Sequence, residues 1–263
     1  MGLGFIRDTY QRWGAEDPFY AVLTRHNRAG NRWDPEEFFA HGRAEIAGVM
    51  DYLDSLGIDV RGGSALDFGC GVGRLSQALA DHMGEVVGVD IAESMVDAAR
   101  AHNRHGERVR YLVNTRPDLS CFRDASFDLV YSNITLQHIP PRYARVYIRE
   151  FLRVVRPHGC ALFQMRSGPR IEPGTLRALF YRMNREHLRH VLQRLKGRLP
   201  YEIHFIAREQ VEEIVARAGG TLADVVELGG RRRRNYRYCV VGSPKEAASG
   251  HRAGPSPDGP AHG

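Results

Sequence analysis

The sequence has few cysteines and no long run of hydrophobic residues. Four of its 263 residues are cysteines, and none of them forms a C-x-x-C pair. This scatter excludes zinc-finger spacing and a disulfide framework, so we expect reduced thiols. No apolar stretch approaches the roughly 18–20 residues that a membrane span needs, and the first residues lack the apolar core of a signal peptide. We therefore expect a cytoplasmic protein with no membrane segment.

Two common phosphate-binding patterns are also missing. The dinucleotide pattern G-x-G-x-x-G fails because Arg74 stands at the position of its last glycine. No G-x-x-x-x-G-K-[ST] loop occurs in the chain. A dinucleotide fingerprint and a P-loop are thus excluded as explanations of the glycine-rich segment.

What the sequence does contain is a glycine-rich turn between an apolar strand and a helix. Residues 65–75 are Ala-Leu-Asp-Phe-Gly-Cys-Gly-Val-Gly-Arg-Leu, and a second apolar strand closes on Asp90, 21 residues after Gly69. Glycines allow a tight turn and a close approach of the backbone to a ligand. Nucleoside-containing ligands bind at the carboxyl ends of parallel strands, and a carboxylate there accepts hydrogen bonds from ribose hydroxyls. The pattern predicts this role for Asp90.

The order of these segments resembles the class I S-adenosylmethionine (SAM)-dependent methyltransferases. Asp67-x-Gly-x-Gly-x-Gly is similar to motif I of that family, and residues 88–96 are similar to its second motif. The likeness is strong over residues 46–166 and looser over residues 205–242. It implies a Rossmann-like α/β fold, in which helices cover both faces of a mainly parallel seven-stranded sheet. It also implies methyl transfer from SAM, with S-adenosyl-L-homocysteine as the product. A metal is not expected, because no pair of acids at the ends of the fourth and fifth strands is spaced to hold Mg²⁺.

The same resemblance assigns residues to the cofactor site. Asp118 and Leu119 are the best match to the loop that contacts adenine, although they are shifted from its usual position. Arg43 has two interpretations, as a contact of the SAM carboxylate or as a solvated helix arginine. The expected cofactor-binding residues are Asp67, Gly69, Cys70, Gly71, Gly73, Asp90, Ile91, Met95, Asp118, Leu119, Asn133 and Arg43.

Candidates for catalysis and substrate binding lie elsewhere in the chain. His138, within Ile-Thr-Leu-Gln-His-Ile-Pro-Pro at residues 134–141, follows the fourth expected strand at its carboxyl end. An imidazole suits proton uptake near neutral pH, but members of the family often have a similar segment, so a general base and a structural role both stay open. Tyr20 and Trp33 are candidates for an aromatic lid or for ordinary packing, and Arg166 is a candidate substrate contact.

The chain divides into three parts by its sequence pattern. Residues 1–45 are rich in aromatics and are expected to form a helical cap or lid, and residues 46–242 the SAM-binding domain. Residues 243–263, with four Pro and four Gly, are expected to be a disordered tail. Within the cap, Asp34 before Pro35 predicts a helix start.

Three further elements follow from apolar spacing and glycine punctuation. The period of the apolar residues predicts a helix over residues 44–56. Residues 208–218 are expected to form the last helix of the core. Residues 222–228 and 236–241 are expected to form a closing antiparallel pair of strands at one edge of the sheet.

Positive charge is concentrated in one segment. The whole chain has a net charge of +6, yet residues 166–200 contain nine Lys/Arg against two acids. Residues 167–204 are expected to be an insertion whose basic helix, residues 175–197, covers the cofactor cleft. Such asymmetry suggests an anionic partner: a small acid, a phosphate or nucleic acid. The run Arg231–Arg234 is either a surface loop or an anion clamp.

The sequence leaves more than one function open. One is methyl transfer to an O, N or C nucleophile of a small molecule, such as an anionic compound or a natural-product intermediate, because residues 1–45 and 167–204 would enclose a pocket. The basic segments favour an RNA or protein methyltransferase, but no Asn-Pro-Pro-Tyr-like motif and no RNA-binding module is present. The intact glycine turn and Asp90 oppose a non-catalytic SAM-binding protein. A monomer and a homodimer both stay open.

Overall fold

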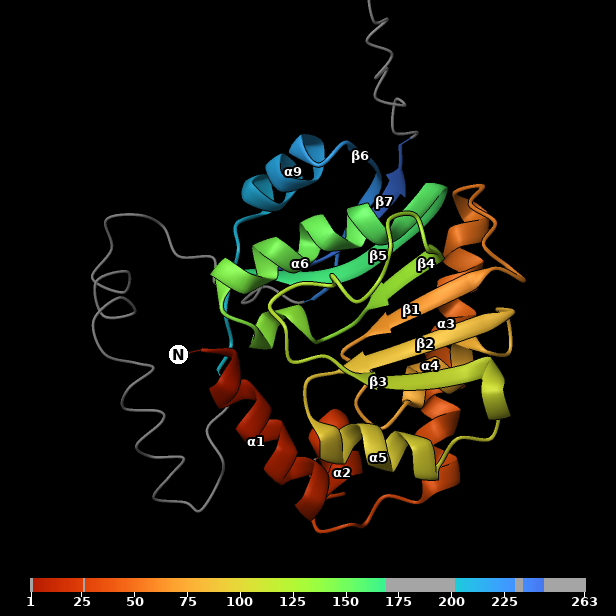
Figure 1. Cartoon of the computed structure of the whole chain (residues 1–263), viewed down its shortest axis with the longest axis vertical. Coiled ribbons are helices and arrows are strands. Elements are labelled where there is room, and N and C mark those ends of the chain that lie inside the picture. Colours follow the sequence, from red (N-terminus) through yellow and green to blue (C-terminus); the bar gives the residue numbers. More distant parts are fainter. Residues whose placement is uncertain (1, 26, 169–201, 230–233, 244–263) are drawn as a thin grey trace, which may run out of the picture.

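The computed structural model describes residues 2–25, 27–168, 202–229 and 234–243. The predicted helix at 175–197, the tail at 243–263 beyond its first residue, and Arg231 to Arg233 lie outside the described residues. Figure 1 shows one sheet with helices on both of its faces. The strands are β1 (Ser64–Phe68), β2 (Glu85–Asp90), β3 (Val109–Val113), β4 (Phe127–Ser132), β5 (Val155–Gly168), β6 (Gly220–Glu227) and β7 (Arg234–Gly242).

The sheet has the order β3-β2-β1-β4-β5-β7-β6. Strands β1 to β5 run parallel, whereas β7 is antiparallel to both β5 and β6. The predicted seven-stranded, mainly parallel sheet is therefore confirmed, as is the antiparallel pair at its edge. The central strands are short apolar runs buried on both sides, such as Val86, Val87 and Val89 of β2, as expected for a parallel sheet covered on both faces.

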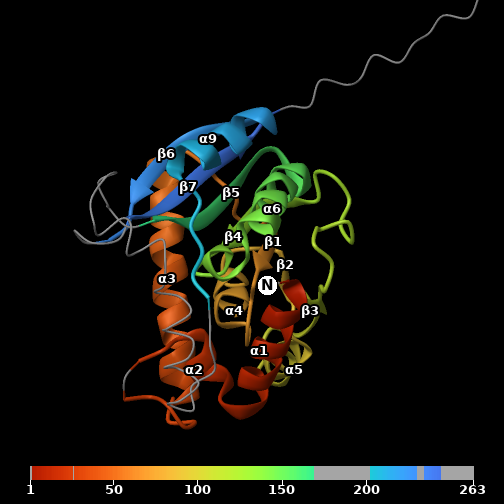
Figure 2. The ribbon, with the colours of Figure 1, turned by 90° about the vertical axis from the view of Figure 1, so that its left-hand side faces the viewer.

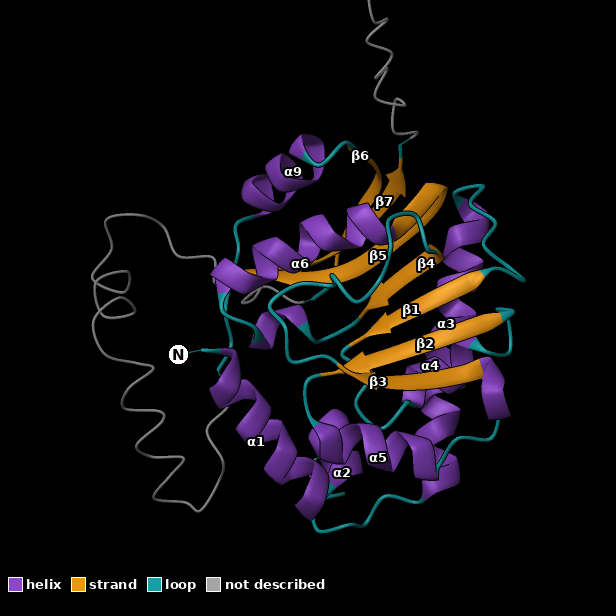
Figure 3. Cartoon of the chain, in the orientation of Figure 1, coloured by secondary structure: helices purple, strands orange, loops and turns teal. Residues whose placement is uncertain are grey.

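The helices form two layers and a cap, which Figure 3 separates from the strands by colour. Helices α3, α4 and α5 cover one face, where Ile46, Leu79 and Val96 share a core with β1 and β2. Helices α6 and α9 cover the other face, where Phe151 and Val211 share a core with β4, β5 and β7. The helices are α1 (Leu3–Glu16), α2 (Pro18–Val22), α3 (Pro35–Ser55), α4 (Arg74–Leu79), α5 (Glu93–Ala101), α6 (Pro141–Val154) and α9 (Arg208–Arg217), with 3₁₀ turns at η1 (Gly106–Arg108) and η2 (Leu136–His138).

Helix α3 corrects the predicted division of the amino-terminal region. The predicted start is confirmed, because the Asp34 carboxylate accepts a hydrogen bond from the Glu37 N–H (2.9 Å) and Pro35 is the first helical residue. The helix then continues to Ser55, so the two expected helices are one. A boundary at residue 45 would cut this helix, whose side chains Phe38, Ile46 and Leu53 are all buried. The cap proper therefore consists of α1, α2 and the segment that leads to α3.

The cap lies at the edge of the sheet to which the parallel strands point, as Figures 1 and 2 show. Helix α1 docks on the start of α5: the Ser94 hydroxyl donates to the Gln11 carbonyl oxygen (2.7 Å), and the Ser94 N–H donates to the Gln11 side chain (3.1 Å). Gly14 permits this approach, because a Cβ at that position would overlap Ser94 Oγ and lie 3.0 Å from the Met95 nitrogen.

The close packing at Gly14 predicts the effect of a methyl group there. In a free helix Gly→Ala stabilises by about 0.5–1 kcal/mol. Here we expect Gly14→Ala to lower the free energy of unfolding by about 1–3 kcal/mol, because the added carbon has no room between α1 and α5. Gly4→Ala in the same helix is the matched control, since a Cβ at Gly4 meets no atom within 4 Å. Urea unfolding of both variants measures the difference, and a stabilised Gly14→Ala would show that α1 is not docked.

Candidate active site

The glycine turn after β1 has the left-handed backbone that its sequence predicts. Gly69, Gly71 and Gly73 have φ angles of +77°, +53° and +78°, which residues other than glycine rarely adopt. The Gly69 and Cys70 N–H groups donate to the Val89 carbonyl oxygen (2.8 and 3.0 Å) and so tie the turn to β2. A Cβ on Gly71 would lie 2.6 Å from Val22 Cγ2, so α2 of the cap contacts this turn closely.

Asp90 closes β2 beside the turn. Its carboxylate accepts hydrogen bonds from the Gly71 N–H (2.9 Å) and the Ala92 N–H (3.0 Å). Burial raises the pKa of Asp90, and the backbone N–H groups of Ala92, Gly71 and Ile91 oppose that rise. A carboxylate offers about four acceptor positions, so further lone pairs stay available to hydroxyl groups of a ligand.

Asp67 lies beneath the turn and not in the cavity. Its carboxylate accepts a hydrogen bond from the Ser76 hydroxyl (2.6 Å) on α4. Burial raises the pKa of Asp67 to about 7, against the lowering effects of Ser76 and of the positive charge of Arg74. In this structure Asp67 fixes the start of α4 under the glycine turn. Its predicted role toward SAM stays a prediction.

A cavity of about 850 Å³, which includes its mouth, lies between the strand ends and the cap. Six predicted cofactor residues line it, namely Gly69, Gly71, Asp90, Ile91, Met95 and Asn133. The other predicted cofactor residues, Asp67, Cys70, Gly73, Asp118, Leu119 and Arg43, are not among its lining residues. The remaining lining residues are Leu3, Ile6, Tyr10, Ala21, Val22, Phe68, Val89, Asn114, Ile134, Thr135, His138, Ile139 and Tyr147.

The segment that follows β3 differs from the expected adenine loop. Leu119 is buried in the apolar core, and the Asp118 carboxylate accepts from the Ser120 N–H (3.1 Å). The residue of this loop that lines the cavity is Asn114. It directly follows β3, and its N–H donates to the Asp90 carbonyl oxygen (2.8 Å). The rule that polar residues at strand ends face the ligand, applied to Asp90, would also have found Asn114.

Arg43 and the aromatic lid candidates lie away from the cavity wall. The Arg43 guanidinium donates to Glu36 (2.6 Å) at the exposed start of α3. Trp33 is buried, donates to the Leu23 carbonyl oxygen (3.1 Å), and packs with Tyr20 in the aromatic cluster that holds the cap. The cap residues that do line the cavity are mostly aliphatic, and their spacing in α1 and α2 resembles ordinary core packing. No feature of the sequence distinguished them from core residues.

His138 lines the cavity at η2 and has a defined tautomer. Its Nδ1–H donates to the Glu202 carbonyl oxygen (2.9 Å), so the lone pair lies on Nε2, which accepts from the Gln137 amide (3.0 Å). Burial, together with the smaller effect of the charge of Arg166 on β5, lowers the pKa of His138 to about 4, against the raising effect of the hydrogen bond to the Glu202 carbonyl oxygen. The imidazole is therefore neutral at pH 7 and is only a weak base in this structure. The Tyr10 ring lies edge-on to it, with 6.2 Å between ring centres.

Ile134 has an unusual backbone between β4 and η2. Its φ is +60°, which is strained for a β-branched residue, and its side chain is 42% exposed while it lines the cavity. Both neighbours are held in place: the Asn133 amide donates to Glu45 (2.5 Å), and the Thr135 hydroxyl donates to the Asn133 carbonyl oxygen (3.1 Å). Strain of this kind is typical of ligand sites.

Comparison with known proteins agrees with this geometry. Residues 65–159 match a methyltransferase domain family. A ubiquinone biosynthesis O-methyltransferase of Bordetella avium is 28% identical over 205 residues, which are 77% of this chain and 78% of the relative. A 2-methyl-6-phytyl-1,4-hydroquinone methyltransferase of Synechocystis is 29% identical over 59% of this chain and 48% of its own length. The crystal structure of magnesium protoporphyrin IX methyltransferase from Synechocystis, with S-adenosylhomocysteine bound, superposes with a TM-score of 0.60 at 20% identity, covering 92% of this chain and 99% of that one.

The chain has the fold of the class I SAM-dependent methyltransferases, and its residues 65–159 belong to the methyltransferase domain family. It is a methyltransferase, and its cofactor is SAM. Several other curated relatives match over shorter stretches; for one from Xanthomonas oryzae, the match spans 45% of the relative's length. The relatives have different methyl acceptors in their names, and the acceptor of this chain is therefore a matter for its own cavity.

The residues of the cavity suit this cofactor. Asp90 holds free acceptor positions for ribose hydroxyls, and the glycine turn keeps the backbone at Gly69 and Gly71 open to a ligand, because neither carries a side chain. Among the described residues, no group of three or more His, Cys, Asp or Glu could hold a metal ion. Within the same part of the chain, no helix is long and apolar enough to cross a membrane.

The buried carboxyl of Asp67 predicts a pH dependence of stability in the ligand-free methyltransferase. Its pKa in the fold, about 7, is above its ordinary value. The protonated form is therefore favoured by folding, and this contribution is present at low pH and lost as the pH rises through 7. We expect wild type to lose up to about 3 kcal/mol of stability between pH 5 and pH 8 through this group.

Asp67→Asn keeps an oxygen for the Ser76 hydroxyl but cannot ionise. Urea unfolding at pH 5 and pH 8 should show a smaller loss of stability for Asp67→Asn than for wild type. Equal losses in the two proteins would mean that Asp67 is already ionised in the fold at pH 5.

Proposed function

We propose that this methyltransferase transfers the methyl group of SAM to a hydroxyl oxygen of an uncharged, largely apolar small molecule. The observation that carries the proposal is the lining of the cavity, in which the apolar side chains Leu3, Ile6 and Ile139 and the Tyr10 ring stand together with the neutral imidazole of His138. Among the described lining residues Asp90 is the one charged side chain. The relatives named O-methyltransferases support oxygen over nitrogen or carbon as the acceptor atom.

The lining of the cavity bears on two alternatives, an anionic acceptor and an RNA or protein substrate. An anionic acceptor would need a cation in the wall, and the described lining residues include neither Lys nor Arg. The basic segment that suggested an anion falls mostly in residues outside the described ranges. Helices α1 and α2 cover the cavity, which supports a small molecule over an RNA or a protein chain. Cytoplasmic location stays part of the proposal.

The chain's own residues supply binding, orientation and a proton acceptor. Bound SAM supplies an electrophilic methyl group on a sulfonium, whose thioether leaves readily. Asp90 and the glycine turn hold the nucleoside side of the cavity, while α1 and α2 limit the access of water. At the other side, His138 Nε2 carries a lone pair because Nδ1 is committed to Glu202.

His138 is proposed to orient the acceptor hydroxyl and then take its proton. A base with a pKa of about 4 does not ionise a hydroxyl in advance. It does accept the proton once the oxygen gains its methyl group, because the methylated oxygen is then strongly acidic. The acceptor must replace the Gln137 amide at Nε2, so Gln137 is a neighbour that moves when substrate binds.

Removal of the Asp90 carboxylate tests the cofactor site. We expect Asp90→Ala to weaken the binding of SAM and S-adenosylhomocysteine by roughly 30-fold or more, because it removes charge-assisted hydrogen bonds to ribose hydroxyls. Isothermal titration calorimetry measures the change. Asp97→Ala is the control, since Asp97 pairs with Arg100 on the exposed side of α5. Equal affinities of wild type and Asp90→Ala would place the ribose elsewhere.

Replacement of His138 tests the proposed acceptor chemistry. Methyl transfer from isotopically labelled SAM to a panel of alkyl-substituted catechols and other phenols should proceed with wild type. His138→Gln should lower kcat by about 100-fold and leave the affinity for S-adenosylhomocysteine unchanged. Transfer to amines but to no hydroxyl compound would overturn the choice of oxygen. Unchanged turnover in His138→Gln would assign the histidine a packing role.

A further inference from the structure

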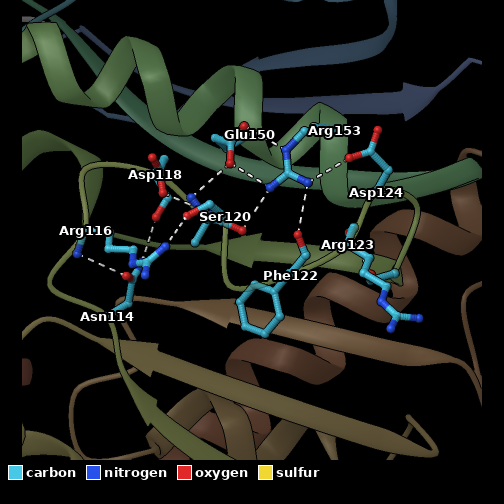
Figure 4. A network of polar contacts seen from close by, with 11 residues as sticks. Asn114, Arg116, Asp118, Ser120, Phe122, Arg123, Asp124, Glu150 and Arg153 are labelled. Carbon is cyan, nitrogen blue, oxygen red and sulfur yellow. Dashed lines mark hydrogen bonds and ion pairs between the residues drawn. The ribbon is translucent and has the colours of Figure 1, made fainter.

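Side chains of helix α6 hold the loop between β3 and β4 by bonding to the backbone atoms of that loop. The Leu119 N–H donates to Glu150 (2.9 Å), and Arg153 donates to the carbonyl oxygens of Leu119 (2.9 Å) and Phe122 (3.0 Å). Figure 4 shows Glu150 and Arg153 extending from the helix toward this loop. One turn earlier on α6, the Tyr147 hydroxyl donates to the Arg116 carbonyl oxygen (2.6 Å).

The bonding residues of the helix and their partners in the loop have the same spacing along the chain. Tyr147, Glu150 and Arg153 are three residues apart and therefore lie along one side of the helix. Their loop partners, at residues 116, 119 and 122, are also three residues apart. We call these three helix residues the α6 clamp. Because the clamp binds backbone atoms, it sets the path of the loop whatever side chains the loop carries.

The clamp is stabilised internally by charge. Arg153 forms ion pairs with Glu150 (2.7 Å) and with Asp124 (2.8 Å), and the Glu150 side chain is only 16% exposed. The hydrogen bond from Arg153 lowers the pKa of Glu150, so this carboxylate is ionised and accepts from the loop at neutral pH. A planar guanidinium can span several acceptors in fixed directions, which a lysine ammonium cannot do.

The clamped loop leads directly to the cavity wall. The Asn114 side chain donates to the Asp118 carbonyl oxygen (2.8 Å) and accepts from the Arg116 N–H (3.1 Å), so it is held by the same loop. Asn114 and Tyr147 both line the cavity, and Asn114 follows β3 next to Asp90. A shift of the loop backbone would therefore move Asn114 relative to the ribose-binding carboxylate.

We propose that Glu150 and Arg153, with the Tyr147 hydroxyl, are positioning residues for the cofactor. They fix the loop at residues 114–122 so that it recognises the adenine of SAM beside Asp90. Neither Glu150 nor Arg153 lines the cavity, so they act through the loop. The inference rests on the assignment of SAM to this cavity, and it predicts that damage to the clamp impairs recognition of the base in particular.

The test compares two ligands by isothermal titration calorimetry. One is S-adenosylhomocysteine, and the other is S-inosylhomocysteine, in which a keto oxygen replaces the 6-amino group of the base. Wild type should prefer the adenine compound. Arg153→Met should weaken its binding by about tenfold and bring the ratio of the two affinities toward one, because the loop is no longer held at two carbonyl oxygens. Arg153→Lys should recover little, since it keeps the charge but not the planar geometry.

Arg156→Met is the matched control. Arg156 pairs with Asp128 and donates to Ser64 (3.2 Å) at the opposite ends of the strands, so its loss should leave both affinities unchanged. Tyr147→Phe removes only the hydroxyl and should change both affinities in the same direction as Arg153→Met. It tests the clamp even if Arg153→Met fails to fold.

Three outcomes would contradict the proposal or the cofactor site on which it rests. Unchanged affinities and an unchanged ratio in Arg153→Lys and Tyr147→Phe would overturn the clamp. A wild type that binds both ligands equally would show that the loop does not recognise the base. A wild type that binds neither ligand would overturn the cofactor site itself.

Discussion

The hydrogen bond from the Gly71 N–H to the Asp90 carboxylate joins the two parts of the cofactor site. It ties the glycine turn after β1 to the end of β2, and the bond from the Ala92 N–H holds the same carboxylate at the start of α5. Backbone N–H groups therefore stabilise the negative charge of a half-buried residue before any ligand arrives. Because these groups belong to the turn after β1 and to the start of α5, they fix the acceptor positions of Asp90 in advance, which reduces the cost of ordering on binding.

The fold follows from local sequence features, and so does the place of six predicted cofactor residues on the cavity wall. Alternating apolar strands and helices predict the parallel sheet. The spacing of the glycines and Asp90 predicts that they lie together at the strand ends, where a ligand binds. Tertiary contacts decide the rest. The aliphatic residues Leu3, Ile6 and Val22 resemble core residues in the sequence, and only the docking of α1 and α2 over the strand ends shows that they line a cavity. Trp33 and Tyr20 stand out more in the sequence than these aliphatic residues, but they pack in the aromatic cluster that holds the cap.

Burial also changes the chemistry that residue identity suggests. From its type, His138 is a base for neutral pH, yet its surroundings lower its pKa to about 4. From its place in the motif, Asp67 is expected to bind the cofactor; in the fold, burial raises its pKa to about 7, and its carboxylate accepts a hydrogen bond from Ser76. Neither environment is visible along the chain, because it depends on segments such as residues 202–204 and α4 that meet these groups only in the fold.

The strained backbone at Ile134 has a consequence for attempts to stabilise this enzyme. A glycine would relieve the left-handed φ, and because Ile134 is 42% exposed, less burial would be lost than at a core position. A screen for thermal stability alone would therefore favour that exchange. The same exchange would remove part of the wall of the cavity and loosen the segment that leads to His138. At this position stability and catalysis therefore make opposite demands on the side chain.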